Sequence, residues 1–191
     1  MIAGIVLAAG LARRMGRQKL LLDLRGKTVL RWSVERVLAH IDDVIVVTGG
    51  DQPAVREALA GLAVRFVINP RPQEGQGSSI AVGVSALTPA TDAVLVALGD
   101  QPRLPASVMP ALLEAFRAER KVIVAPVYRG VQGTPVLFAR EVFPELRALT
   151  GDAGARAVVN ADPARVTRVR IDAPMPPDVD TPEDYARLHV E

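Results

Sequence analysis

The residues best suited to phosphate chemistry lie in a glycine-bearing loop that directly follows an apolar run at the N-terminus. Segment 7–19 reads LAAGLARRMGRQK. Gly10 and Gly16 allow a phosphate to approach the backbone, and charged side chains from Arg14 and Lys19 suit triphosphate oxygens. The loop is not a Walker A motif, because Lys19 stands three residues after Gly16, and it does not match GxGxxG. It predicts a phosphate site of another kind, with a solvated surface turn as the alternative.

Acidic residues in two distant segments could hold a divalent cation. Asp100 occurs in the sequence GDQP, right after an apolar run, and Asp178 and Asp180 occur in PPDVDTPED near the C-terminus. Mg²⁺ prefers one or two carboxylates together with substrate phosphates. We therefore predict a Mg²⁺ site with Asp100 as its first ligand. Taken alone, each segment is explained better by turn and helix-cap residues.

A turn-rich segment at 69–80, NPRPQEGQGSSI, leads into a helix that we expect to start with Gly77, Ser78 and Ser79. Small residues and exposed backbone N–H groups at a helix start can accept a ribose, a phosphate or a base edge. The two serines are equally good N-cap residues. The segment therefore indicates a nucleotide site only in combination with the others.

The elements that must position these residues alternate between strand and helix. Strands are expected at 2–8, 43–48, 64–69, 92–98 and 121–127, and helices at 29–40, 53–61, 79–87 and 105–120. The strand runs are apolar without strict alternation, which is typical of strands covered on both faces. The pattern predicts an α/β domain with a mainly parallel sheet. Nucleotides bind such sheets at the carboxyl ends of the strands, where the glycine loop and Asp100 fall.

The regular alternation stops after Val127. Extended runs are expected at 128–138 and 165–171, a helix near 139–147 and turns at 150–156. We interpret residues 128–171 as an insertion or lid on the acceptor side of one domain that spans 1–191. Near the C-terminus, Thr181 is followed by a proline and then by Asp184, which is typical of a capped helix start.

Composition excludes several classes of chemistry. The 191 residues include no Cys and two His, which excludes thiolate catalysis and leaves little for a His-rich metal site or a catalytic triad. The net charge is +2, the basic residues are scattered and aromatics make up 4%, which argues against a nucleic-acid partner. The apolar run at 1–12 is too short to span a bilayer. We expect a soluble, cytoplasmic protein without a membrane partner.

Six motifs in this order resemble the nucleotidyltransferase family that attaches a nucleotide to molybdopterin, and among its members the cytidylyltransferases most. The motifs are LAAGLARRMGRQKLL, NPxxxxGxxSSI, GDQP, GxxGTPVLF, LTGDAGAR and DVDTPEDY. The resemblance implies a Rossmann-like, GT-A-type three-layer fold. It also implies Mg²⁺-dependent transfer of CMP from CTP to the phosphate of molybdopterin, with release of pyrophosphate. The implied protein partner is a molybdenum hydroxylase, contacted transiently.

The resemblance also assigns roles to individual residues. The nucleotide site would comprise Leu7, Ala8, Ala9, Gly10, Arg14, Gly16, Lys19, Asn69, Gly75, Ser78, Ser79 and Asp100. The catalytic residues would be Arg14, Lys19 and Asp100, and the metal ligands Asp100 and Asp180, with Asp178 as the alternative to Asp180. The acceptor would contact Gly133, Asp152 and Arg156. A helix cap with a surface arginine is the alternative for Asp152 and Arg156.

Ala9 and the GQGSSI loop favour CTP, because guanylyl members usually read LAGG where this chain reads LAAG. Pro72 and Thr134 depart from the family pattern, on the base side and the pterin side respectively. A phosphate nucleophile is mostly ionised at pH 7 and needs no general base, so catalysis would consist of alignment and charge neutralisation. The alternatives are a guanylyltransferase, a nucleotidyltransferase for another phosphorylated acceptor, and a non-catalytic carrier of the cofactor for a molybdenum hydroxylase.

Overall fold

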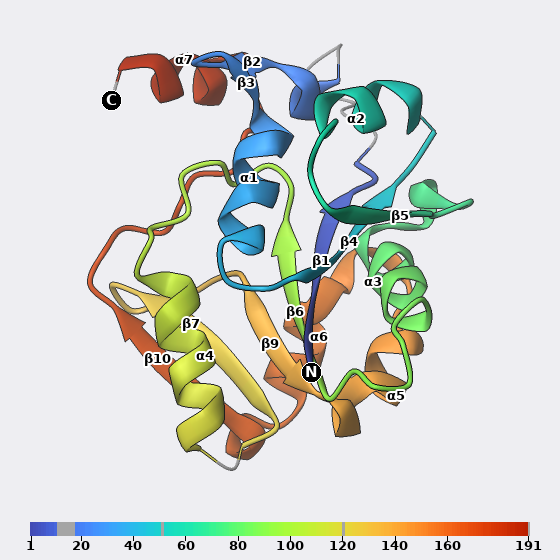
Figure 1. Ribbon diagram of the computed structural model, residues 1–191. Coiled ribbons are helices and arrows are strands. Elements are labelled where there is room, and N and C mark those ends of the chain that lie inside the picture. Colours follow the sequence, from blue (N-terminus) through green and yellow to red (C-terminus); the bar gives the residue numbers. More distant parts are fainter. Residues whose placement is uncertain (11–17, 51, 120, 191) are drawn as a thin grey trace.

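A central sheet of eight strands runs through the molecule. The computed structural model describes residues 1–10, 18–50, 52–119 and 121–190 (Figure 1). The sheet order is β10-β7-β9-β6-β1-β4-β5, with β8 paired to β7. Its strands are β1 (Ile2–Ala8), β4 (Asp43–Thr48), β5 (Val64–Ile68), β6 (Ala93–Leu98), β7 (Ile123–Tyr128), β8 (Val131–Gln132), β9 (Val136–Ala139) and β10 (Val166–Ile171). A separate ribbon pairs β2 (Asp23–Leu24) with β3 (Lys27–Thr28).

The sheet is mainly parallel, as the sequence predicts. The neighbours β6-β1-β4-β5 run parallel to one another, as do β10 and β7. Strand β9 lies between β6 and β7 and is antiparallel to both. Val136 at the start of β9 therefore pairs with Val96 near the carboxyl end of β6. This register brings the chain just before β9 to the edge of the sheet at which Asp100 emerges.

Helices cover both faces of the sheet. They are α1 (Val29–Leu38), α2 (Gln52–Ala58), α3 (Gln76–Ser85), α4 (Val108–Ala118), α5 (Phe143–Arg147), α6 (Gly154–Ala161) and α7 (Pro182–Val190). One layer contains α1 and α4, and the other contains α3, α5 and α6 (Figure 1). None of these helices, within the residues described, is long and apolar enough to cross a membrane. The three-layer, Rossmann-like α/β arrangement confirms the predicted fold class.

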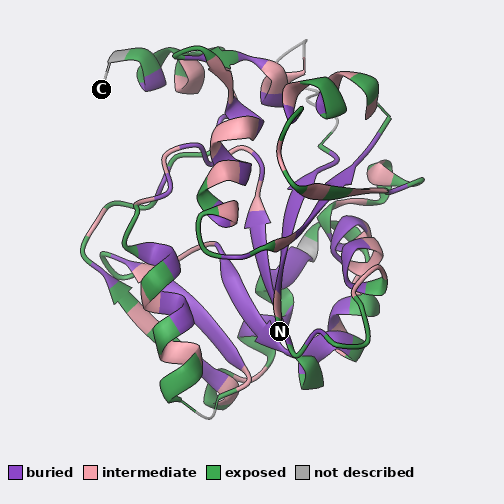
Figure 2. Ribbon diagram, viewed as in Figure 1, coloured by how far each residue is buried: buried purple, intermediate pink, exposed green. Residues whose placement is uncertain are grey.

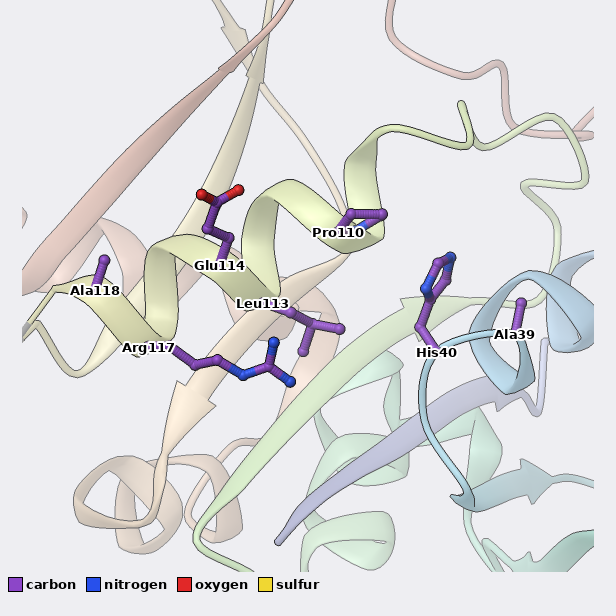
Figure 3. Close-up of a pocket in the computed structure, with 7 residues that line it drawn as sticks. All are labelled: Ala39, His40, Pro110, Leu113, Glu114, Arg117 and Ala118. Carbon is purple, nitrogen blue, oxygen red and sulfur yellow. The ribbon is translucent and has the colours of Figure 1, made fainter.

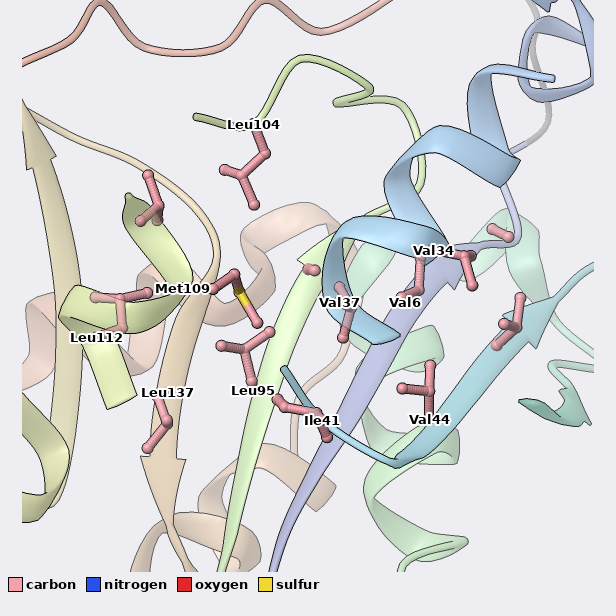
Figure 4. Close-up of a cluster of buried hydrophobic side chains, with 14 of the residues drawn as sticks. Val6, Val34, Val37, Ile41, Val44, Leu95, Leu104, Met109, Leu112 and Leu137 are labelled. Carbon is pink, nitrogen blue, oxygen red and sulfur yellow. The ribbon is translucent and has the colours of Figure 1, made fainter. Parts of the chain in front are cut away.

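Each central strand packs on both helical layers because its residues alternate between the two faces. On β1, Val6 joins the cluster that includes Val37 of α1 and Met109 of α4, whereas the adjacent Ile5 joins the cluster beneath α3. Figure 4 shows the first of these clusters. The central strands are buried and the outward faces of the helices are exposed (Figure 2). Burial on both faces explains why the strand runs are continuously apolar.

The segment 128–171, which we predict to be an acceptor-side insertion or lid, supplies three strands to the central sheet. These are β8, β9 and β10, and the expected helix near 139–147 is present as α5, preceded by a 3-10 turn. The segment also contains α6. Its acceptor-side role stays a prediction.

Candidate active site

Asp100 is placed by a close contact between the ends of β6 and β1. The backbone N–H of Gly99 donates a hydrogen bond to the carbonyl oxygen of Leu7 at 2.9 Å. A Cβ at position 99 would lie 2.8 Å from that same oxygen, so only glycine allows the two chains to approach so closely. The carboxylate of Asp100 thus emerges beside the residues that lead into the predicted phosphate loop.

The ammonium group of Lys19 joins two aspartates from distant parts of the chain. Lys19 begins a short 3-10 turn, and its Nζ donates to Oδ2 of Asp100 at 2.6 Å and to Oδ1 of Asp180 at 2.7 Å. Burial lowers the pKa of Lys19, but the two carboxylates outweigh that effect, so the pKa lies above its usual value. Lys19 is therefore positively charged at neutral pH. The two predicted metal ligands, Asp100 and Asp180, therefore both contact the ammonium nitrogen of Lys19.

Asp178 interacts electrostatically with Lys19, Asp100 and Asp180, and it belongs to the same C-terminal segment as Asp180. The segment is held to the end of β6 because the N–H of Val179, a buried residue, donates to the carbonyl oxygen of Asp100 at 3.2 Å. The protein around the Asp178 carboxyl desolvates it and raises its pKa, although the residue as a whole is exposed. The charges of Asp100 and Asp180 raise that pKa further, against a hydrogen bond from Gln101 and the charge of Lys19. The carboxyl groups therefore form a locally negative site.

The C-terminal segment is anchored by the start of α7. The N–H of Asp184 donates to Oγ1 of Thr181 at 3.1 Å, and the N–H of Thr181 donates to Oδ2 of Asp184 at 2.9 Å. This reciprocal pair confirms the predicted capping box. Further along α7, Leu188 is buried in a small cluster with Val29 of α1. Asp180, which immediately precedes Thr181, is thereby tied to a packed helix.

The predicted nucleotide segment at 69–80 is held in place by a buried asparagine. Nδ2 of Asn69 donates to the hydroxyls of Ser78 at 2.8 Å and Ser79 at 2.9 Å. Helix α3 begins at Gln76, one residue before the predicted start, and its N-cap residue is Gly75. The prediction that Ser78 and Ser79 serve equally well as N-caps is therefore wrong, because both lie inside the first turn. Their hydroxyls instead hold the loop against Asn69.

The predicted acceptor residues fall in two places. Asp152 lies against the nucleotide loop, because a Cβ on Gly75 would be 2.5 Å from Oδ1 of Asp152. Arg156 is exposed on α6. Gly133 instead packs on the ring of Tyr128, with an added Cβ 2.9 Å from Cε2. Asp152 therefore lies at the nucleotide loop, whereas Gly133 lies beside Tyr128 at the end of β7.

The remaining predicted nucleotide residues lie at the end of β1. Leu7, Ala8 and Ala9 are buried, and Gly10 is exposed. A Cβ on Gly49, which the sequence did not single out, would lie 3.2 Å from the carbonyl oxygen of Ala9 and 3.5 Å from Cγ of Pro72. Ala9, which follows β1, and Pro72 of the 69–80 segment therefore approach each other at Gly49. Arg14 and Gly16 lie outside the described residues.

Sequence reasoning also missed Gln101 and the position of Thr134 beside it. Nε2 of Gln101 donates to Oδ1 of Asp178 at 2.8 Å, and Oγ1 of Thr134 donates to Oε1 of Gln101 at 2.6 Å. The only available signal was that Gln101 follows Asp100 directly in the motif GDQP. No local sequence pattern predicts that Gln101 contacts Thr134 and Asp178, which are distant in the chain.

A separate groove of about 770 Å³ lies between the end of α1 and α4 (Figure 3). Its lining residues are Ala39, His40, Pro110, Leu113, Glu114, Arg117 and Ala118. None of them is a predicted site residue. The groove therefore does not contribute to the site around Asp100.

The family model of the MobA-like NTP transferase domain matches residues 4–166 of this chain. The chain belongs to this family. Nicotine blue oxidoreductase of Paenarthrobacter nicotinovorans is 32% identical, covering 98% of this chain and 96% of that protein. Purine catabolism protein PucB of Bacillus subtilis is 29% identical, covering 96% and 94%. Molybdenum cofactor cytidylyltransferase of Escherichia coli is 25% identical, covering 95% and 92%.

Solved structures of similar proteins have the same fold as this chain. Rv0371c of Mycobacterium tuberculosis H37Rv is 32% identical with a TM-score of 0.89, covering 100% of this chain and 98% of that one. A structure of Rv0371c in complex with manganese has a TM-score of 0.83 over the same coverage. The nucleotidyl transferase Mth528 of Methanothermobacter is 28% identical with a TM-score of 0.83, covering 100% and 96%. This MobA-like chain is therefore a nucleotidyltransferase by family and by fold.

Proposed function

We propose that this MobA-like protein transfers CMP from CTP to the terminal phosphate of molybdopterin and releases pyrophosphate. The observation that carries the proposal is the meeting of Lys19, Asp100 and Asp180 at the carboxyl edge of the sheet. The family supports nucleotidyl transfer, and the E. coli cytidylyltransferase supports CTP and the molybdenum cofactor as substrates. Transient delivery of the product to a molybdenum hydroxylase, in the cytoplasm, belongs to the same proposal.

The residues around Lys19 fit a divalent metal ion such as Mg²⁺ or Mn²⁺. Carboxylate oxygens are the hard ligands such ions prefer. Oδ2 of Asp100 and Oδ1 of Asp180 already share one cationic partner at 2.6 Å and 2.7 Å. Within the part of the chain that the structure describes, no three His, Cys, Asp or Glu side chains form a ready-made metal cluster. The related Rv0371c has been solved with manganese, which supports a divalent ion in this family.

The reaction joins two anions and needs no protein base. An oxygen of the acceptor phosphate would attack the α-phosphorus of CTP, and the bond from that phosphorus to the bridging oxygen of pyrophosphate would break. A bound metal ion would supply positive charge to the phosphates. Lys19 would turn its ammonium group to the triphosphate, and Asn69 would hold the serines of the nucleotide loop in place.

The decisive experiment incubates the purified protein with molybdopterin, Mg²⁺ and each nucleoside triphosphate in turn. We expect pyrophosphate release with CTP and a product with the mass of the cytosine dinucleotide. Release with GTP alone would establish a guanylyltransferase. Release only with another phosphorylated acceptor, such as a sugar phosphate, would move the acceptor away from molybdopterin.

The same assay separates the transferase from two other classes of function. One relative is named an oxidoreductase, and a redox reaction releases no pyrophosphate. A non-catalytic cofactor carrier would also release none, and its Asp100→Asn variant would still support maturation of a molybdenum hydroxylase. Absence of pyrophosphate with every nucleotide and acceptor would overturn the proposed function.

A further inference from the structure

Asp152 brings an exposed carboxylate to the nucleotide loop, residues 69–80, from a distant part of the chain. A Cβ on Gly75 would lie 2.5 Å from Oδ1 of Asp152 and 2.5 Å from the carbonyl carbon of Gly151. A Cβ on Gly77 would lie 2.9 Å from the carbonyl oxygen of Thr150. The turn 150–152 therefore packs directly on the nucleotide loop, and Asp152 is the charged residue of that turn.

The backbone on both sides of this contact holds Asp152 in place. Gly75, the N-cap of α3, has a φ of 95° and a ψ of 179°. Gly154, the first residue of α6, has a φ of 55° and a ψ of −162°. Backbone of this kind is strained for any residue but glycine. The amide of Gln76 lies where a Cβ on Gly154 would be, so the starts of α3 and α6 also touch.

The polar side chains of the nucleotide loop bond one another. Nδ2 of Asn69 donates to the hydroxyls of Ser78 and Ser79, and Oδ1 of Asn69 accepts from the N–H of Arg71 at 2.9 Å. The hydroxyl of Ser78 donates to the carbonyl oxygen of Gly75 at 2.8 Å. These groups, which the sequence led us to expect at the nucleotide, thus hold the shape of the loop instead.

The carboxylate of Asp152 is left for a ligand. Among the residues that the structure describes, no group donates a hydrogen bond to it or pairs with it. The carboxylate of Glu74, in the same loop, is paired with Arg71 at 3.1 Å. The amide of Gln76 can donate or accept, so it fits any base edge, whereas a carboxylate only accepts. Asp152 can therefore distinguish a donor from an acceptor on a base.

Cytosine and uracil differ in the groups that they offer to a carboxylate. Cytosine carries an amino group, a hydrogen-bond donor, at the ring position where uracil carries a carbonyl oxygen. The ring N–H of uracil is flanked by two carbonyl oxygens, which would repel a carboxylate. A carboxylate beside the base edge thus favours cytosine.

We propose that Asp152 is a specificity-determining residue that accepts a hydrogen bond from the 4-amino group of cytosine and so selects CTP over UTP. This inference rests on the proposed function, since it requires a cytidine nucleotide at the loop 69–80. It replaces the contact with the acceptor that the family resemblance implied for Asp152. It does not depend on which phosphorylated acceptor takes the nucleotide.

The test measures the dissociation constants of CTP and UTP by isothermal titration calorimetry, with Mg²⁺ and without an acceptor. The two nucleotides share the ribose and the triphosphate, so the ratio of their constants reports on the base alone. We expect the wild type to bind CTP about 10- to 100-fold more tightly than UTP. Asp152→Asn can donate to uracil as well as accept from cytosine, so the ratio should fall towards one. Equal binding of CTP and UTP by the wild type would overturn the inference.

Asp42→Asn is the matched control. Asp42 is an exposed aspartate just before β4, at the opposite end of the sheet from the nucleotide loop. This variant should keep the wild-type ratio. If Asp152→Asn weakens CTP and UTP by the same factor, Asp152 only supports the packing of the loop and the inference is overturned.

The binding assay and the pyrophosphate assay together separate this inference from the proposed function. If the wild type transfers CMP to molybdopterin and Asp152→Asn keeps the ratio of CTP to UTP binding, only the inference fails. If Asp152→Asn loses the ratio but the wild type transfers nothing to molybdopterin, the inference stands and the proposed acceptor fails. If the wild type binds neither CTP nor UTP, both fail.

Discussion

The ammonium nitrogen of Lys19 lies 2.6 Å from Oδ2 of Asp100 and occupies the point where that carboxylate meets Asp180. The side chains of Lys19 and Asp100 are only 13% and 17% exposed, so water screens their attraction weakly. A divalent ion placed between the aspartates would have to displace this ammonium. A metal ion bound there would therefore compete with Lys19 for the same carboxylates until a bound triphosphate offered Lys19 another partner.

Replacing Lys19 should separate metal binding from turnover. We expect Lys19→Met to bind Mn²⁺ more tightly than the wild type without nucleotide, because the competing cation is gone. Pyrophosphate release should fall about 10²- to 10³-fold, because one charge contact to the transition state is lost. Lys27→Met removes a more exposed lysine paired with Glu35 and should change neither quantity. Weaker Mn²⁺ binding by Lys19→Met would contradict the competition.

Removing the carboxylate charge of Asp100 should abolish the reaction without unfolding the protein. We expect Asp100→Asn to lower pyrophosphate release by at least about 10²-fold, because the metal loses its first ligand. The control is Asp43→Asn, which breaks an ion pair with Arg65 at the other end of the sheet and should cost less than about 1 kcal/mol. Far-ultraviolet circular dichroism checks that both variants are folded. Wild-type turnover by Asp100→Asn would exclude Asp100 from the metal site.

Asp178→Asn should have opposite effects with and without metal. Without metal, we expect a slightly higher Tm, because one of three neighbouring negative charges is removed. The gain in the free energy of unfolding should be less than about 1 kcal/mol, because water screens this charge. With saturating Mn²⁺, the variant should gain less stability than the wild type. Asp172→Asn, at an exposed aspartate of the same segment, serves as the control. Equal stabilisation of Asp178→Asn and wild type by Mn²⁺ would show that Asp178 is not a ligand.

The contact between the nucleotide loop and the 151–152 turn can be tested with a pair of glycines. Gly75 has a φ of 95° and a ψ of 179°, a backbone region that is essentially confined to glycine, and Gly26 has a φ of 83°, so alanine is strained at both positions. Only at Gly75 would the new Cβ also collide, at 2.5 Å from the backbone of Gly151. Gly75→Ala should therefore lower the Tm more than Gly26→Ala and raise KM for the nucleotide. Equal KM values would separate this loop from nucleotide binding.

Local features of this protein were readable from the sequence because they depend on neighbouring residues. Continuous apolar runs predicted the strands, since residues buried on both faces are apolar at every position. The capping box at Thr181 and Asp184 was predicted for the same reason, because both partners lie within one turn of chain. The motif order placed Asp100 and the glycine loop at strand ends, where a nucleotide site was expected.

The tertiary structure alone decided which distant residues share the site. The insertion of β9 between β6 and β7 brings Thr134 to Gln101, and the C-terminal segment crosses the end of β6 to bring Asp178 and Asp180 to Asp100. The placement of Asp152 against Gly75 likewise depends on how α6 packs beside α3. Local sequence patterns do not predict strand order, because that order depends on how the faces of the whole sheet are buried against the helices. The sequence thus determined which chemical groups are present, and the fold determined that Asp100 and Asp180 both meet Lys19.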